Sequence, residues 1–148
     1  MRECYTLDLS QVSLEQRTIY LDRSKNGDRR QVPLSSTVIR VLAEHMTTER
    51  SAIKERSGRV FPYWSGSRAV AELDTVTRDL SRVFALAFEA AGAPTLHFHD
   101  LRHEATCRLY EKTKLSDVLI SKITGHRDLR MLKRYASLRG SELANHLW

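Results

Sequence analysis

The chain has 148 residues, of which 41% are hydrophobic and 28% charged, and its formal net charge is +6, as is typical of one globular domain with a buried core. No apolar run reaches the about 20 residues that a membrane span needs, and residues 1–9 lack the apolar core of a signal peptide. The two cysteines, Cys4 and Cys107, exclude a disulfide scaffold and favour a reducing, cytoplasmic compartment, while the basic charge favours a polyanionic partner such as nucleic acid.

The first third of the chain predicts a small antiparallel sheet. Residues 16–22 (QRTIYLD) are rich in β-branched and aromatic side chains, and residues 29–35 (RRQVPLS) predict the returning strand. Between them, residues 24–28 (SKNGD) contain Asn-Gly, which is a strong signal for a hairpin turn. Residues 12–14 (VSL) add a short third strand to this prediction.

The hydrophobic period changes to that of a helix after the predicted sheet. Ser35 or Ser36 is a suitable N-cap, and the residues that recur after it at helical spacing are Val38, Val41, Leu42 and His45 or Met46. A further helix is predicted over 47–56, and residues 58–64 predict a short extended segment that Pro62 stops. Residues 65–69 (SGSRA) predict a loop.

The second half of the chain predicts helices. One helix is expected over 75–91, because an apolar stripe runs along it and Gly92 and Pro94 follow its end. The members of that stripe are Val76, Leu80, Val83, Phe84, Ala87 and Phe88. Three shorter helices are expected over 99–111, 116–124 and 128–136. A small antiparallel sheet followed by helices predicts an α+β fold, in one domain that covers residues 1–148.

Three of the six histidines in the chain fall within residues 97–103, around Arg102. One interpretation is a metal site, because His99, His103 and Cys107 share a helix face at positions i, i+4 and i+8. Structural zinc sites usually take four ligands at short paired spacings, and no second Cys/His pair completes such a set. We therefore expect no metal and no other cofactor.

Two other interpretations fit the same residues. In an ordinary amphipathic helix, the stripe that faces the core would be Leu101, Ala105 and Leu109. Asp100 would then cap the start of the helix or complement its dipole. In a phosphate site, His99 and Arg102 would point the same way from a helix N-terminus, as a guanidinium and an imidazole. These residues alone favour the ordinary helix, and a phosphate site needs partners elsewhere.

Such partners lie further along the chain. HDLRH at 99–103 is followed by Gly125-His126 and, nine residues after that histidine, by Tyr135. This pattern resembles the tyrosine recombinases, the phage integrase family, whose catalytic domains carry an H-x-L-R-H motif, then an L-G-H motif and then a tyrosine at the same distance. Thr124 stands where the family usually has leucine, and we expect that change to be harmless. The joint order and spacing is far more specific than any one of its parts.

The N-terminal part of the chain is similar to the same family. Residues 3–35 resemble the stretch that runs from the first catalytic arginine through a β-hairpin, and Lys25 occupies the place of a lysine that the family carries in that hairpin. Glu3 matches the glutamate of the family's R-x-x-E motif, so the arginine itself would fall immediately before Met1. The resemblance therefore implies a fragment without the family's N-terminal DNA-binding domain, and one that is inactive alone.

The resemblance implies that the protein cleaves and rejoins DNA. Tyr135 would attack a backbone phosphate to give a 3′-phosphotyrosine and a free 5′-hydroxyl, and Arg102 would neutralise the charge that develops. His99 and His126 would contact the phosphate or move the tyrosine proton, and Lys25 would protonate the leaving oxygen. The supporting residues would be His103 and Glu3. No ATP is needed, because the covalent link conserves the phosphodiester energy.

Two alternatives stay open beside a recombinase. A type IB topoisomerase-like enzyme would share this chemistry, and a non-catalytic DNA-binding module would suit the short helices and the charge. Tyr135 with Arg102 argues against the second, because binding alone does not require them. The resemblance also implies a bacterial or phage protein that assembles as a homotetramer on double-stranded DNA, with the isolated fragment monomeric. The apolar residues of the tail, 140–148, would pack on their own core or pass to a neighbouring subunit on DNA.

Overall fold

A computed structural model describes residues 1–22, 29–49, 58–140, 144 and 147. The chain forms two compact units, Met1–His97 and Phe98–Trp148, and each is described by itself. Lys25 and the predicted turn around it lie outside the described residues, as do most of the helix predicted over 47–56 and most of the C-terminal tail. Within the described ranges, no helix is both long enough and apolar enough to span a membrane.

The first unit contains the predicted antiparallel sheet. Strand β1 (Val12–Ser13), strand β2 (Thr18–Leu21) and strand β3 (Arg30–Pro33) lie in the order β1-β2-β3. Ile19 of the central strand is paired with Val12 on one side and Val32 on the other. β-Branched side chains are thus directly opposite each other on all three strands, and such cross-strand pairs stabilise a sheet. The short helix α1 (Arg2–Tyr5) and the 3₁₀ helix η1 (Leu9–Gln11) precede the sheet.

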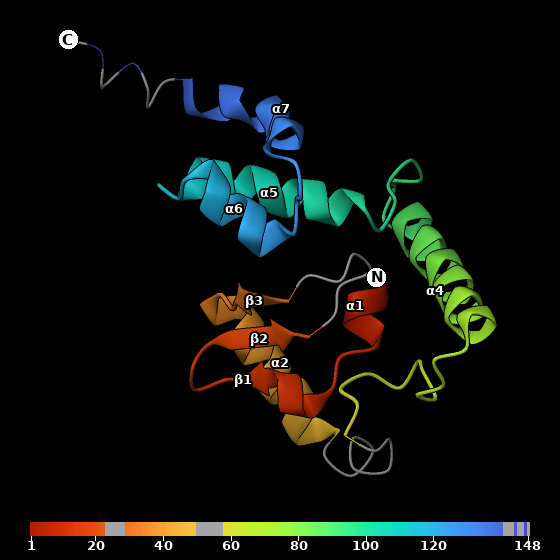
Figure 1. Ribbon diagram of the computed structural model, residues 1–148. Helices are drawn as coiled ribbons and strands as arrows, with labels where there is room; N and C mark the ends of the chain where they lie inside the picture. Colours follow the sequence, from red (N-terminus) through yellow and green to blue (C-terminus); the bar gives the residue numbers. More distant parts are fainter. Residues whose placement is uncertain (23–28, 50–57, 141–143, 145–146, 148) are drawn as a thin grey trace. The chain divides into compact units, whose positions relative to one another are not determined.

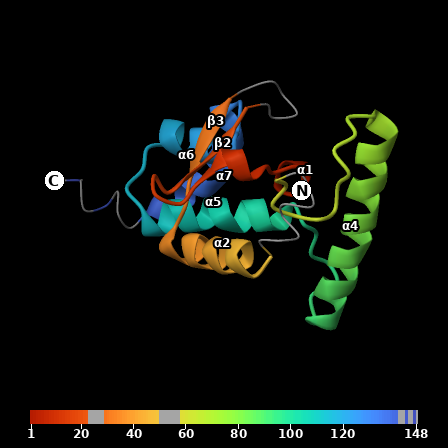
Figure 2. The same cartoon turned by 90° about the horizontal axis from the view of Figure 1, so that it is seen from below.

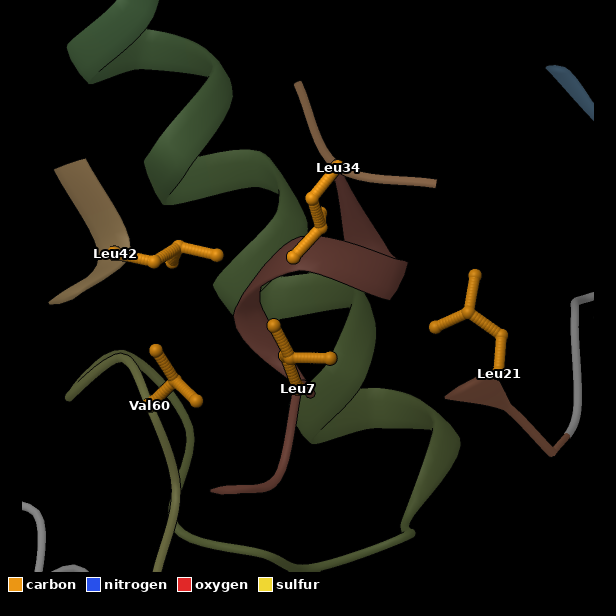
Figure 3. Close-up of a cluster of buried hydrophobic side chains, with 5 residues drawn as sticks. All are labelled: Leu7, Leu21, Leu34, Leu42 and Val60. Carbon is orange, nitrogen blue, oxygen red and sulfur yellow. The ribbon is translucent and has the colours of Figure 1, made fainter. Parts of the chain in front are cut away.

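A single apolar core joins the sheet to helix α2 (Ser36–Thr48), which Figures 1 and 2 show beside the strands. Figure 3 shows the five buried side chains converging: Leu7, Leu21, Leu34, Leu42 and Val60. Val60 belongs to the segment predicted as extended, and its backbone N–H donates to the carbonyl of Leu7 at 3.0 Å. That segment also forms an isolated antiparallel bridge between Asp8 and Arg59. The core therefore joins residues that are far apart in the sequence, from Leu7 to Val60.

Helix α2 begins where the sequence predicts, because Ser35 caps it. The Oγ of Ser35 accepts a hydrogen bond from the backbone N–H of Val38 at 3.3 Å. Since a lost serine cap costs about 1 kcal/mol, we expect Ser35→Ala to lower the free energy of unfolding by that amount in urea denaturation. Ser36→Ala is the matched control, because Ser36 is the exposed first residue of the helix. Equal losses in both variants would contradict the capping role.

Helix α4 (Val70–Ala90) begins five residues before the predicted start at residue 75. The extra turn, VAELD, contains good helix formers and neither Gly nor Pro, so nothing in it stops the helix. The predicted apolar stripe is only partly correct: Leu80 is buried, whereas Val83 is 59% exposed. The first half of α4 is held to α1, where the hydroxyl of Tyr5 donates to the carbonyl of Leu73 at 3.0 Å.

The second unit is helical, and α5 (Asp100–Lys112), α6 (Asp117–Thr124) and α7 (Lys133–Ala136) lie together in Figures 1 and 2. Its buried core consists of Tyr110, Ile120, Leu132 and Tyr135. The single helix predicted over 128–136 is instead the 3₁₀ helix η2 (Leu129–Leu132) followed by α7 and the 3₁₀ helix η3 (Ser137–Arg139). The side chain of Asp128 accepts from the N–H of Arg130 two residues on, a local bond that favours the tighter turn.

The buried face of α5 differs from the predicted stripe. Leu101 is 46% exposed and Ala105 is also exposed, while Leu109 is only partly buried. The face turned inward instead carries Thr106 and Tyr110, which are 0% and 2% exposed. The prediction was wrong because the inward face of this helix packs on the core of α6, η2 and α7, where Tyr110 stacks on the ring of Tyr135.

Candidate active site

The first two turns of α5 place three polar side chains close together. His99 is the N-cap residue, so Arg102 and His103 follow it at the spacing of one helical turn. The rings of His99 and His103 are perpendicular, with centroids 4.8 Å apart. One turn further on, the hydroxyl of Thr106 donates to the carbonyl of Arg102 at 2.8 Å. The helix therefore carries an arginine and two imidazoles in mutual contact at its N-terminal end.

Tyr135 reaches this group from α7. Its side chain is 5% exposed, and its hydroxyl lies 2.5 Å from the Nδ1 atom of His103. Burial raises the pKa of the Tyr135 phenol above its ordinary value, and the positive charges of Arg134 and Arg102 oppose that rise. The phenol is therefore protonated at neutral pH. A reaction that uses its oxygen as a nucleophile needs an adjacent proton acceptor, and His103 occupies that position.

The ring of Tyr110, on α5, packs against the ring of Tyr135. The two rings are stacked, with centroids 5.8 Å apart and planes inclined by 21°. The hydroxyl of Tyr110 donates to Asp117 at 2.9 Å, and the guanidinium of Arg139 lies 4.7 Å from the centre of its ring. Burial and the bond to Asp117 raise the pKa of Tyr110 to about 12, so this second phenol also stays neutral.

His126 enters the site from the end of α6. Gly125 adopts the left-handed conformation with φ 75°, which ends the helix and turns the chain back. The backbone N–H of His126 then donates to the carbonyl of Ser121 at 3.0 Å, and its side chain is buried. Burial is the largest cause that lowers the pKa of His126 to about 4, and Arg102 and His103 lower it further. His126 is therefore a neutral imidazole under electrostatic influence from Arg102.

The second unit thus holds five of the seven predicted site residues: His99, Arg102, His103, His126 and Tyr135. Of the other two, Lys25 lies outside the described residues. Glu3 belongs to the first unit, where its carboxylate accepts two hydrogen bonds from Arg30 at 3.0 and 2.7 Å. Its support of the site stays a prediction. Among the described residues, no group of three His, Cys, Asp or Glu side chains is placed to hold a metal ion.

A buried tyrosine bonded to an imidazole, beside an arginine and a second imidazole, suits nucleophilic attack on an anionic phosphate. The model of the phage integrase family matches residues 1–142 of the chain. The chain belongs to the phage integrase family. It is also 32% identical to the shufflon-specific DNA recombinase of Escherichia coli over 145 residues, which are 98% of this chain and 33% of that protein. An integrase/recombinase of Haemophilus influenzae is 35% identical over 131 residues, 88% of this chain and 31% of the relative.

The fold agrees with this family membership. The crystal structure of XerA recombinase matches with a TM-score of 0.66 and 18% identity, over 97% of this chain and 52% of that one. The α+β prediction is confirmed, and so is the resemblance to a tyrosine recombinase catalytic domain over nearly the whole chain. The chain spans about a third of the length of the curated relatives it matches.

For this integrase-family chain, the structure adds residues that the motifs did not identify. They are Thr106, Tyr110, Asp117 and Arg139. Thr124 belongs to the motif, where its change from leucine was expected to be harmless, yet its Oγ1 atom contacts His126. The spacing of α5 held a usable signal, because Thr106 and Tyr110 lie one and two helical turns beyond Arg102. Asp117 and Arg139 gave no such signal in the sequence, because only their contacts with Tyr110 connect them to the site.

Proposed function

We propose that the protein containing this chain is a site-specific DNA recombinase that cleaves and rejoins DNA through Tyr135. The observation that carries this proposal is the 2.5 Å hydrogen bond between the buried Tyr135 hydroxyl and His103, on the helix that also bears Arg102. This contact places the phenol beside an imidazole that can take up its proton, on the same helix as an arginine. The relatives named as recombinases support the same chemistry.

The proposed reaction is a transesterification. The Tyr135 oxygen attacks the phosphorus of a backbone phosphodiester, and its proton passes to Nδ1 of His103. The bond from phosphorus to the 5′-oxygen breaks, and Lys25 supplies the proton that this oxygen takes up, which leaves a 3′-phosphotyrosine and a 5′-hydroxyl. Arg102 neutralises the charge on the non-bridging oxygens, and His99 and His126 contact the same phosphate. Attack by another 5′-hydroxyl reverses the step and needs no cofactor.

A nicked suicide substrate tests this proposal. Loss of the short strand beyond the cleavage point traps the covalent intermediate, so the full-length protein should form an adduct that survives denaturation. Mass spectrometry of the attached peptide should place the DNA on Tyr135. A protein that binds the site but yields no adduct would be a DNA-binding module. An enzyme that relaxes supercoils, forms the adduct and fails to exchange strands between two sites would be topoisomerase-like.

The proposed partner is double-stranded DNA, with the full-length protein acting as a tetramer. The 148-residue chain itself, with net charge +6, should be monomeric and bind DNA weakly, with Kd on the order of micromolar and a steep loss as salt rises. It should form almost no adduct, because only Arg102 of the two arginines that the family resemblance assigns to the phosphate lies within it. Binding that does not change with salt, or adduct at the full-length rate, would contradict these expectations.

A further inference from the structure

The last residue of α6, Thr124, touches the imidazole of His126 across the turn at Gly125. Its Oγ1 atom lies 2.6 Å from Nδ1 of His126 and 2.7 Å from the carbonyl oxygen of Ile120. Both distances are those of hydrogen bonds that involve a hydroxyl. One hydroxyl therefore has two close partners, of which one is a pure acceptor.

The number of hydrogens decides the direction of both bonds. A carbonyl has no hydrogen and a threonine hydroxyl has one, so the hydrogen between Thr124 and Ile120 must be that of Thr124. The Thr124 oxygen is left with lone pairs only, and its contact with His126 requires a hydrogen on Nδ1. The reverse assignment would put two oxygens 2.7 Å apart with no hydrogen between them.

We infer that Thr124 is a positioning residue that holds His126 in the Nδ1–H tautomer and leaves Nε2 as the acceptor nitrogen of the ring. This inference rests on the proposed function for its catalytic meaning, whereas the tautomer itself follows from the hydrogen bonds. The left-handed turn at Gly125 makes the contact possible, since it brings residue 126 back over residue 124.

The surroundings of His126 keep this tautomer neutral. Its side chain is buried, and the pKa of His126 falls to about 4 through burial first and then through Arg102 and the two neighbouring histidines. An imidazole in that state carries a lone pair on Nε2. His126 is therefore equipped to accept a proton or a hydrogen bond there. It can donate from Nε2 to a phosphate oxygen, the contact proposed above, only after it has gained a proton.

Three variants of the full-length protein separate this role from a structural one. Thr124→Val keeps the shape of the side chain and removes the hydroxyl, and Thr124→Ser restores the hydroxyl without the methyl group. Thr47→Val is the matched control, because Thr47 on α2 makes the same bond to a carbonyl four residues back, at 2.8 Å, in the other unit. It removes an equivalent hydrogen bond far along the chain from His126.

The first measurement is the tautomer of His126, from imidazole nitrogen NMR of protein labelled with ¹⁵N-histidine at neutral pH. His126→Gln assigns the signal. We expect the Nδ1–H form in the wild type and in Thr124→Ser, and loss of that form in Thr124→Val. An Nε2–H tautomer in the wild type would overturn the inference, and that result does not depend on DNA cleavage.

The second measurement is the rate of adduct formation on the suicide substrate. Loss of a bond that orients a metal-binding histidine typically reduces activity about 10- to 100-fold, and we expect Thr124→Val to fall in the same range. Thr124→Ser should recover most of the rate, and Thr47→Val should match the wild type. A wild-type rate in Thr124→Val would refute the positioning role. Absence of adduct in the wild type itself would instead refute the proposed function, while the NMR result would still decide the tautomer.

Discussion

Tyr135→Phe should abolish the covalent protein–DNA adduct while leaving the fold and DNA binding intact. The substitution removes only the phenolic oxygen, so the ring keeps its stack on Tyr110 and its place in the core of the second unit. The lost hydrogen bond to His103 should cost stability of only about 1 kcal/mol. The nucleophile, by contrast, has no substitute at that position. The measurement is denaturing gel electrophoresis of the full-length variant on the suicide substrate, beside a gel-shift titration of DNA binding.

Tyr63→Phe is the matched control for that variant. Tyr63 is 54% exposed and lies in the first unit, so the loss of its hydroxyl should change neither adduct yield nor affinity. Adduct from Tyr135→Phe at the wild-type rate would mean that another residue is the nucleophile. A variant that lost DNA binding as well would show that the Tyr135 hydroxyl stabilises the fold or binds DNA, rather than acting as the nucleophile.

Features set by short-range chemistry were predictable from the sequence. Ser35 begins α2 as predicted, and the third strand forms at residues 12–13 because its branched residue pairs with the hairpin. At α6, Ser116 caps the start and Gly125 ends the helix in the left-handed conformation, within a residue of the predicted bounds. Each of these signals lies within a few residues of the structure it determines. The family motif was recognisable for a different reason, namely the joint spacing of residues 99–103, 126 and 135.

The features that were not predictable depend on contacts between distant segments. Hydrophobic periodicity assigned Leu101 and Ala105 to the core side of α5, yet the inward face carries Thr106 and Tyr110. Their burial depends on the ring of Tyr135 and on Arg139, whose Nε donates to the carbonyl of Tyr110 at 3.2 Å, from 29 residues further along the chain. A pattern within one helix carries no information about such partners. Hydrophobic periodicity therefore does not predict which polar face of a helix is buried in this candidate site.

Arg102→Ala should reduce adduct formation by about 10³- to 10⁵-fold, the range for losing an arginine that stabilises a transferring phosphoryl group. That range corresponds to about 4–7 kcal/mol of transition-state stabilisation. The fold should survive, because Thr106 donates to the backbone carbonyl of residue 102, which the substitution keeps. Arg102→Lys should recover only part of the rate, since an ammonium keeps the charge but loses the planar fork that matches two phosphate oxygens.

Arg108→Ala is the control for charge and position. Arg108 lies on the same helix, 64% of its side chain is exposed, and its partner is Glu104 at 2.7 Å, so it carries the same charge outside the site. Both variants lose one positive charge, and only Arg102→Ala should lose cleavage.

NMR of His126 gives a second, independent result. Because the charge of Arg102 helps to depress the pKa of His126, that pKa should rise from about 4 toward its ordinary value in Arg102→Ala, while burial keeps it below that value. Cleavage within tenfold of the wild type, together with an unchanged His126 pKa, would place Arg102 outside the reaction.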